Sequence, residues 1–178
     1  MLLDRAKSLL LLVDMQERLV PAMVDAADVR ARCGVLLRGA YELSVPILAS
    51  EQYPKGLGPT LPGLTEFITQ RLEKMEFSAY ANPAIRDALK RAGQPQLILA
   101  GVEAHVCVLQ TGLDLIDAGY QVFVVADCVS SRRAESREVA LHRVARAGAT
   151  LITAEMALFE WLRSAEAAEF RSISKLIR

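Results

Sequence analysis

The sequence predicts a three-layer α/β/α fold around a mostly parallel sheet of about six strands. Short apolar runs alternate with longer stretches in which apolar residues recur at helical spacing. Several of these runs are continuously apolar, which is typical of parallel strands buried on both faces. The chain has 178 residues, 52% of them hydrophobic, which suits one domain with a substantial core. We therefore expect residues 1–178 to form a single Rossmann-like domain.

The first half of the chain supplies three of the expected strands. A continuous apolar run at 8–13 ends at Asp14, and a second run at 45–49 tolerates a proline near its start. The third run, at 71–75, is shorter and more charged, and it contains Lys74. Asp28 is a candidate N-cap for a helix that reaches about Leu43.

The second half continues the alternation. Asn82 and Pro83 are typical of a helix start, and Gly93 is typical of its end. A strand at 97–100 is bounded by Pro95 and Gly101, and the residues from about 104 to 119 have helical spacing. We further expect a strand at 120–126 ended by Asp127, a helix at 134–147, a strand at 150–153 and a helical remainder.

Cys107 is the first candidate for a chemical role. It lies near the first turn of the helix that follows the strand at 97–100. The N-terminus of a helix carries partial positive charge and free N–H donors, which favour a thiolate and bind an oxyanion. Most cysteines are small core residues, so this position alone does not establish a nucleophile.

Asp14 and Lys74 are the partners that the fold class suggests for Cys107. All three residues lie at or just past the carboxyl end of an expected strand, and ligands of open parallel sheets bind at that edge. Asp14 is suited to take the thiol proton, and Lys74 is suited to hold the charges in place. The polar stretch 50–60, rich in glycine and proline, is either a pocket wall or a plain surface connection.

Composition limits the partners and the compartment. The 21 basic and 21 acidic residues cancel, which argues against nucleic acid or an anionic membrane as a partner. Three widely spaced cysteines give no disulfide framework and no zinc-ligand pattern, and the N-terminus resembles neither a signal peptide nor a membrane span. We expect a cytoplasmic protein. Trp161, Leu158 and Phe159 are candidates for a subunit interface.

Three segments carry a resemblance to a known family. They are Asp14-Met15-Gln16, Lys74 with Phe77-Ser78-Ala79, and the run from Gly101 to Val108. In this order they resemble the signature segments of the isochorismatase-like cysteine hydrolases. The stretch 51–60 and the run 106–111 further resemble the isochorismatase domain-containing branch of that superfamily.

The resemblance implies a catalytic triad in which Cys107 is the nucleophile, Asp14 the general base and Lys74 the third member. It also implies a cis peptide between Val102 and Glu103, with the N–H groups of Glu103 and Cys107 forming the oxyanion hole. Gln16, Gln52 and Phe77 are expected to be substrate-pocket residues, with a place in the core equally open for Phe77.

The resemblance also has implications for the substrate, the cofactors and the oligomeric state. The nicotinamidases of the superfamily carry an Asp/His metal cluster after the second strand, where this chain has Ser50-Glu51-Gln52-Tyr53. We therefore expect no metal and no organic cofactor, and a small-molecule substrate cleaved at an amide or imide C–N bond through a thioester. Members of the superfamily commonly form homo-oligomers. The alternative is a catalytically silent scaffold that binds a small ligand or a protein partner.

Overall fold

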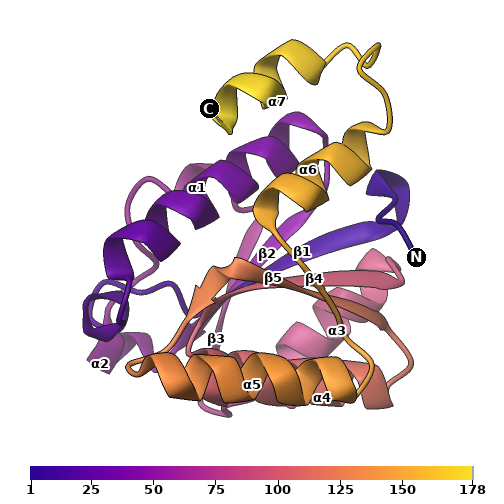
Figure 1. Ribbon diagram of the computed structural model, residues 1–178. Coiled ribbons are helices and arrows are strands. Elements are labelled where there is room, and N and C mark those ends of the chain that lie inside the picture. The colour runs from indigo at the N-terminus through magenta and orange to yellow at the C-terminus, as the bar shows by residue number, and fades with distance from the viewer. Residues whose placement is uncertain (178) are drawn as a thin grey trace.

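A single parallel sheet forms the centre of the molecule. The computed structural model describes residues 1–177, and its six strands lie in the order β3-β2-β1-β4-β5-β6 with every neighbouring pair parallel (Figure 1). The strands are β1 (Ser8–Val13), β2 (Ile47–Gln52), β3 (Gln70–Lys74), β4 (Gln96–Val102), β5 (Gln121–Ser130) and β6 (Thr150–Ile152). This confirms the predicted fold class.

Helices cover both faces of the sheet (Figure 1). One face carries α1 (Ala26–Glu42), α6 (Ala154–Leu162) and α7 (Phe170–Leu176), and the other carries α3 (Pro83–Ala92), α4 (Leu109–Asp117) and α5 (Ala134–Arg146). Successive strand residues point to opposite faces, so Leu10 and Leu12 of β1 join the first core while Leu9 and Leu11 join the second. Both cores are continuous because residues 9–13 of β1 and 97–100 of β4 are apolar without interruption.

The strand order places a topological switch point between β1 and β4. The chain moves outward from β1 through β2 to β3, and then returns to pair β4 with the other side of β1. In open parallel sheets the crevice beside such a switch point binds ligands at the carboxyl ends of the strands. Asp14 directly follows β1, and Cys107 lies five residues beyond the end of β4.

Strand β5 is longer than the sequence indicates. We expected Asp127 to end it, but Asp127 and Cys128 lie within it and the strand continues to Ser130. Leu99 of β4 is in register with Val124 of β5, and Gly101 is in register with Val129. Between these two pairs β5 contains three more residues than β4, so the register shifts here. Arg137 of α5 donates hydrogen bonds to the carbonyl oxygens of Val129 and Ala126 in this irregular stretch. A contact made by the next helix along the chain thus supports backbone that the local pattern interprets as a loop.

The aromatic segment near the C-terminus is also placed differently from our expectation. Trp161 and Leu158 were candidates for a subunit interface, but both are buried between α6, α1 and the sheet. The indole N–H of Trp161 donates to Ser8 Oγ at 3.0 Å. Only Phe159 is partly exposed, and its ring lies 6.4 Å from that of Phe170. Within residues 1–177, no helix combines the length and apolar character needed to cross a membrane.

Gly101 provides a stability test of the β1–β4 contact. It has a φ of +114°, and a Cβ added there would lie 2.0 Å from the carbonyl oxygen of Val13. Gly101→Ala should therefore lower the free energy of unfolding by about 3 kcal/mol or more, because backbone strain and a backbone clash act together. Denaturant unfolding measures the loss.

Gly93→Ala is the matched control. Gly93 also has a positive φ, +74°, but no atom lies within 4 Å of a Cβ built there. Strain alone should cost about 1–2 kcal/mol. Equal losses in the two variants would contradict a tight approach of β1 to β4.

Candidate active site

Three strand ends bring the predicted triad to one edge of the sheet. Val13, the last residue of β1, is in register with Ser50 of β2 and Gly101 of β4. Lys74, the last residue of β3, is in register with Gln52. The residues that follow these positions are therefore neighbours in space although they are far apart in the sequence.

The Asp14 carboxylate is completely buried and has a partner for each oxygen. The Ser50 hydroxyl donates to Oδ1 at 2.7 Å, and the Lys74 ammonium donates to Oδ2 at 2.7 Å. Asp14 has a φ of +50°, a conformation uncommon for a residue other than glycine. Its backbone is held by two hydrogen bonds, from its N–H to the Ser50 carbonyl and from the Gln16 N–H to its own carbonyl.

The Lys74 ammonium is fixed by four acceptors. Besides Asp14 it donates to Gln52 Oε1 at 2.6 Å and to the carbonyl oxygens of Glu76 and Phe77, each at 3.2 Å. Neither the Lys74 nor the Asp14 side chain is exposed. Removing one member of a buried ion pair typically costs about 3–5 kcal/mol, because the other charge is left without its partner. The pair is therefore a rigid unit.

Cys107 lies beside this pair in a widened helical turn. The segment η4 (Ala104–Val108) is a π-helical turn that leads directly into α4, a local feature that is frequent at functional sites. The sequence indicated a helix here but gave no sign of the wider turn. Burial, followed by the negative charge of Asp14, raises the pKa of the Cys107 thiol to about 12, while Lys74 opposes the rise.

This pKa shift corrects the expectation that the helix N-terminus lowers the pKa of Cys107. Only 5% of the residue is exposed, so loss of hydration and the adjacent carboxylate outweigh the partial positive charge of the helix. At neutral pH the resting side chain is a thiol. A nucleophilic thiolate forms only if the proton moves to a neighbouring base.

The turn that carries Cys107 is attached to the end of β5. The peptide bond between Val102 and Glu103 is cis, as the resemblance implies. The Glu103 carboxylate accepts from the Arg132 side chain at 2.9 Å, and its carbonyl accepts from the N–H groups of Val106 and Val108. His105 Nδ1 lies 3.0 Å from Ser131 Oγ, the local hydrogen bond that suits a histidine outside the catalytic set.

Gln16 and Gln52 hold the loop beside the triad. Gln16 is fully buried, and its side-chain amide donates to the carbonyls of Gln52 and Gly58 while its oxygen accepts from the Gln52 N–H. The Gln52 side chain spans from Lys74 to the Met75 carbonyl. Gln16 was expected to be a pocket residue, but its bonds to backbone leave it as a support for the loop.

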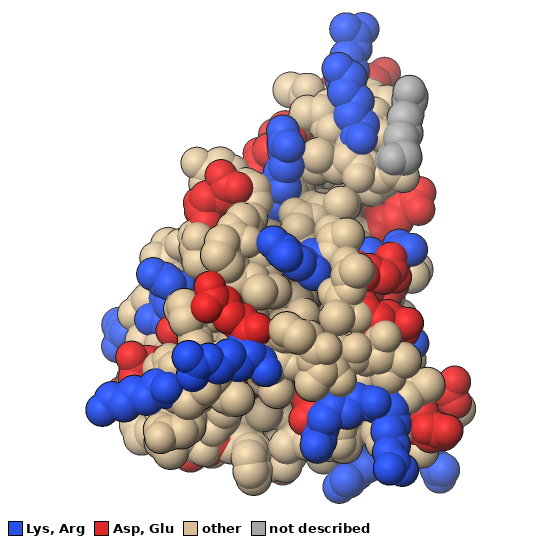
Figure 2. Space-filling view, turned by 90° about the vertical axis from the view of Figure 1, so that its left-hand side faces the viewer, with Lys and Arg blue, Asp and Glu red and all other residues tan. Residues whose placement is uncertain are grey.

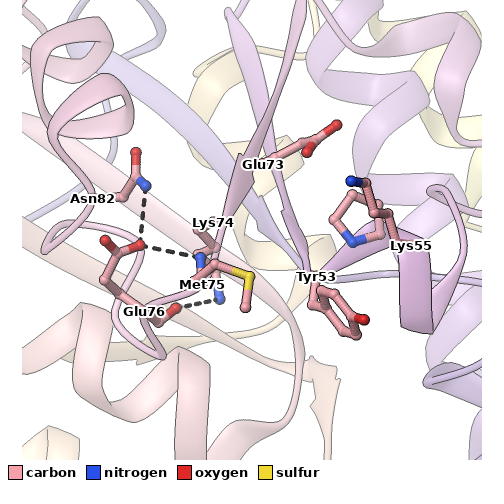
Figure 3. A pocket seen from close by; sticks show the side chains of 8 residues that line it. Tyr53, Lys55, Glu73, Lys74, Met75, Glu76 and Asn82 are labelled. Atoms are coloured by element: carbon pink, nitrogen blue, oxygen red, sulfur yellow. Dashed lines mark hydrogen bonds between the residues drawn. The ribbon is translucent and has the colours of Figure 1, made fainter.

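A hollow of about 310 Å³ lies beside the outer strand β3. Its lining comes from Tyr53 at the start of the loop, from the end of β3 and from Asn82, the N-cap of α3. Figure 3 shows Tyr53 and Lys55 across from Glu76 and Asn82, with Met75 between them. Within the stretch 50–60, residues 53–55 thus form a wall of this hollow. They include the start of the short helix α2 (Pro54–Leu57).

Phe77 lies outside this hollow. Its side chain is 56% exposed, so it is not a core residue, and only its carbonyl reaches the triad. In residues 1–177 no group of three or more His, Cys, Asp or Glu side chains is arranged to hold a metal.

Two supporting residues were missed at the level of sequence. Ser50, which binds Asp14, directly follows the expected strand 45–49, so the strand-end argument that selected Asp14 also applied to it. Arg132, which binds Glu103, was not among the candidate residues. No local signal distinguishes it, because its partner is 29 residues away.

A family model and a curated relative match this chain under the same domain name. The model of the family described as Isochorismatase domain matches residues 8–156. Isochorismatase domain-containing protein 2 of Danio rerio is 39% identical over 171 residues, which is 96% of this chain and 86% of that protein.

Solved structures agree with this match. A structure named MAR1 ribonuclease from Caenorhabditis elegans has a TM-score of 0.93 and 36% identity, covering 99% of this chain and 92% of that one. Two YcaC structures are each 27% identical. The one from Pseudomonas aeruginosa, with hexane-2,5-diol and covalent acrylamide, has a TM-score of 0.93 and covers 98% of this chain and 91% of its own. The Escherichia coli protein, described as an octameric hydrolase of unknown specificity, has a TM-score of 0.94 and covers 99% and 89%.

The pKa of Cys107 can be tested by alkylation. In the wild type the rate of carboxymethylation at Cys107 should rise about tenfold per pH unit from pH 8 to 11, because the thiolate fraction rises at that rate below a pKa of about 12. Asp14→Asn removes a charge that raises this pKa, so alkylation at pH 9 should become roughly tenfold faster for each unit by which the pKa falls.

Asp114→Asn is the control, because Asp114 lies exposed on α4 and its charge is screened by solvent. Mass spectrometry of the folded proteins assigns the labelled cysteine. A rate that levels off near pH 9 in the wild type would contradict the raised pKa.

The role of Gln16 can be tested by its removal. Gln16→Ala deletes one hydrogen bond to the buried Gly58 carbonyl and two to the half-buried Gln52 backbone, and it should lower the free energy of unfolding by about 2 kcal/mol or more. Proteolysis between residues 53 and 59 should also become faster. Gln110→Ala, at an exposed position of α4, should change stability by less than about 0.5 kcal/mol. Similar stability of both variants would remove the support role of Gln16.

Proposed function

This chain belongs to the isochorismatase family, and on that basis we propose that it is a cysteine hydrolase that cleaves an amide-type C–N bond of a small molecule. The observation that carries the proposal is the buried Asp14–Lys74 ion pair beside the Cys107 thiol. A nucleophile, a base and a group that fixes the base are thus next to one another.

In the proposed reaction Asp14 takes the proton of Cys107 as the sulfur attacks the substrate carbonyl. This transfer has to accompany attack, because a thiol with a pKa of about 12 carries almost no thiolate at neutral pH. The N–H groups of Glu103 and Cys107 bind the oxyanion of the tetrahedral intermediate. Lys74 keeps the carboxylate in place throughout, because its own N–H groups are already directed at fixed acceptors.

Collapse of the intermediate breaks the C–N bond. The proton on Asp14 passes to the departing nitrogen, and the acyl group remains on Cys107 as a thioester. A water molecule then loses a proton to Asp14 and attacks the thioester, and the proton returns to the sulfur as the carboxylic acid leaves. No step consumes an oxidant or a reductant. The covalent acrylamide in the Pseudomonas aeruginosa relative shows that a protein of this fold can carry a reactive nucleophile, which supports the proposal.

The alternative is a scaffold that binds a ligand without reaction. A buried ion pair contributes little to stability compared with apolar side chains of similar volume. Its presence here, fixed by Ser50 and Gln52 and next to a thiol, therefore favours chemistry over a purely structural role. The intact set of Asp14, Lys74 and Cys107 disfavours a silent scaffold for the same reason.

The burial of Cys107 favours a small substrate over a polymer. Cys107 is almost wholly buried, which does not suit attack on a polymer. The name of the Caenorhabditis elegans relative makes RNA a substrate to include in the test. On the face shown in Figure 2, however, acidic side chains are interspersed with the basic ones, and the net charge of the chain is zero. We accordingly propose no nucleic-acid partner.

We also propose that the protein forms a homo-oligomer. Met75 and Phe77 are 67% and 56% exposed, and both lie just past the end of β3, the open edge strand of the sheet. Apolar side chains at an unpaired edge favour association with another copy. The octamer of the Escherichia coli relative supports this assembly.

Activity of Cys107 variants tests the proposal. A panel of small amides, imides and esters, together with a single-stranded RNA, is incubated with the wild type, Cys107→Ala and Cys107→Ser. We expect turnover of at least one small amide or imide by the wild type and a loss of ~10³-fold or more in both variants, because the nucleophile is removed.

Cys33→Ala is the matched control, since Cys33 is a buried cysteine that packs against β5. It should keep its kinetics with some loss of stability. Full activity of Cys107→Ala, or cleavage of RNA that survives it, would contradict the proposed mechanism.

A further inference from the structure

The N–H of Glu103 is a buried donor that the fold leaves free. Glu103 is 8% exposed and directly precedes the turn that carries Cys107. Within residues 1–177 its N–H donates no hydrogen bond, whereas the carbonyl of the same residue accepts two. Buried backbone N–H groups rarely lack an acceptor, so this donor is available to a ligand.

The carbonyl and the carboxylate of Glu103 fix the residue at two points. The carbonyl accepts from the N–H groups of Val106 at 3.1 Å and Val108 at 3.2 Å, the residues on either side of Cys107. The carboxylate oxygen Oε2 accepts from Arg132 Nε at 2.9 Å and from the Arg132 backbone N–H at 3.3 Å. Glu103 is therefore bound both to the turn of the nucleophile and to the segment that follows β5.

A second contact ties the same turn to the same segment. His105 Nδ1 lies 3.0 Å from the hydroxyl oxygen of Ser131, the residue before Arg132. Ser131 is completely buried, and its carbonyl accepts from the N–H of Val24 at 3.0 Å. Residues 131 and 132 are thus a fixed support that the turn contacts through two side chains.

The Glu103–Arg132 ion pair contributes little to folding stability. The Arg132 side chain is 63% exposed and that of Glu103 is 10% exposed, and ion pairs that face solvent are weak. The effect of the pair on geometry is not limited in this way. Displacement by about 1 Å of a group that binds the transition state can slow a reaction ~10²-fold. Catalysis and stability can therefore respond differently to loss of this pair.

We propose that Arg132 is a positioning residue that holds the Glu103 carboxylate, so that the Glu103 N–H is directed at the oxyanion of the tetrahedral intermediate. The inference rests on the proposed function of the site, in which the N–H groups of Glu103 and Cys107 bind that oxyanion. Arg132 acts through Glu103 alone. Its loss should slow the reactions of Cys107 that form an oxyanion and spare those that do not.

Two reagents separate these kinds of reaction at Cys107. With p-nitrophenyl acetate the sulfur bonds to the acetyl carbon through an oxyanion, the thiol proton passes to Asp14 and p-nitrophenolate leaves. With iodoacetamide the sulfur displaces iodide from a saturated carbon as the thiol loses its proton, and no oxyanion forms. Absorbance of p-nitrophenolate measures acetylation, mass spectrometry measures alkylation, and Cys107→Ala is the blank.

We expect Arg132→Met to slow acetylation of Cys107 tenfold or more and to change its alkylation less than threefold. Its unfolding temperature should stay close to that of the wild type, because the pair faces solvent. Glu103→Ala should lose at least as much acetylation. Glu103→Gln should recover most of the rate, because its amide oxygen can still accept from Arg132.

Arg38→Met is the matched control. Arg38 Nε donates to Glu42 at 3.1 Å in another exposed ion pair, on helix α1, whose core lies on the opposite face of the sheet from Cys107. This variant removes an ion pair of the same kind and should leave both rates unchanged.

Three results in active protein would overturn the inference. Equal slowing of both reactions in Arg132→Met would indicate a general disturbance of Cys107. Unchanged acetylation in that variant would show that the Glu103 N–H does not depend on Arg132, while the proposed function would stand. A wild type that is alkylated but not acetylated would remove the oxyanion role of the Glu103 N–H. If neither reagent modifies Cys107 in the wild type, the proposed function itself fails and the inference fails with it.

Discussion

The ion pair between Asp14 and Lys74 is the interaction on which the rest of the site depends. Two opposite charges are buried at the edge of the sheet, and this is stable only when every remaining donor and acceptor has a partner. Ser50, Gln52 and two backbone carbonyls supply those partners. The ends of three strands therefore have to keep fixed positions relative to one another.

The same pair sets the chemistry of the thiol. Burial and the carboxylate charge keep Cys107 protonated, so the resting protein does not hold a permanently reactive thiolate. In the proposed reaction, the carboxylate that raises the pKa of the thiol is also the group that receives its proton. Reactivity in such a site is tied to the arrival of a substrate whose developing negative charge the backbone N–H groups can bind.

Most polar side chains around the triad hold the local structure in place and are not available to bind a ligand. Gln16 and Gln52 were expected to be alike as pocket residues, but their amides are used by the loop and by Lys74. Arg132 supports the turn that carries Cys107 through Glu103 in a comparable way. Few polar side chains at this edge of the sheet are therefore left to bind a ligand without losing a bond of their own. A site with few free polar groups discriminates by the one or two that remain.

The sequence by itself determined the layers of the fold, the approximate strands and helices, and the three residues of the candidate triad. It did so because continuous apolar runs specify buried parallel strands, and because residues that follow such strands gather at one edge. Only the tertiary structure decided the direction of the Cys107 pKa shift, the supporting roles of Gln16 and Arg132, the length of β5 and the burial of Trp161. Each of these depends on desolvation, or on a partner that belongs to another element of the fold, and neither is encoded in the pattern of one segment alone.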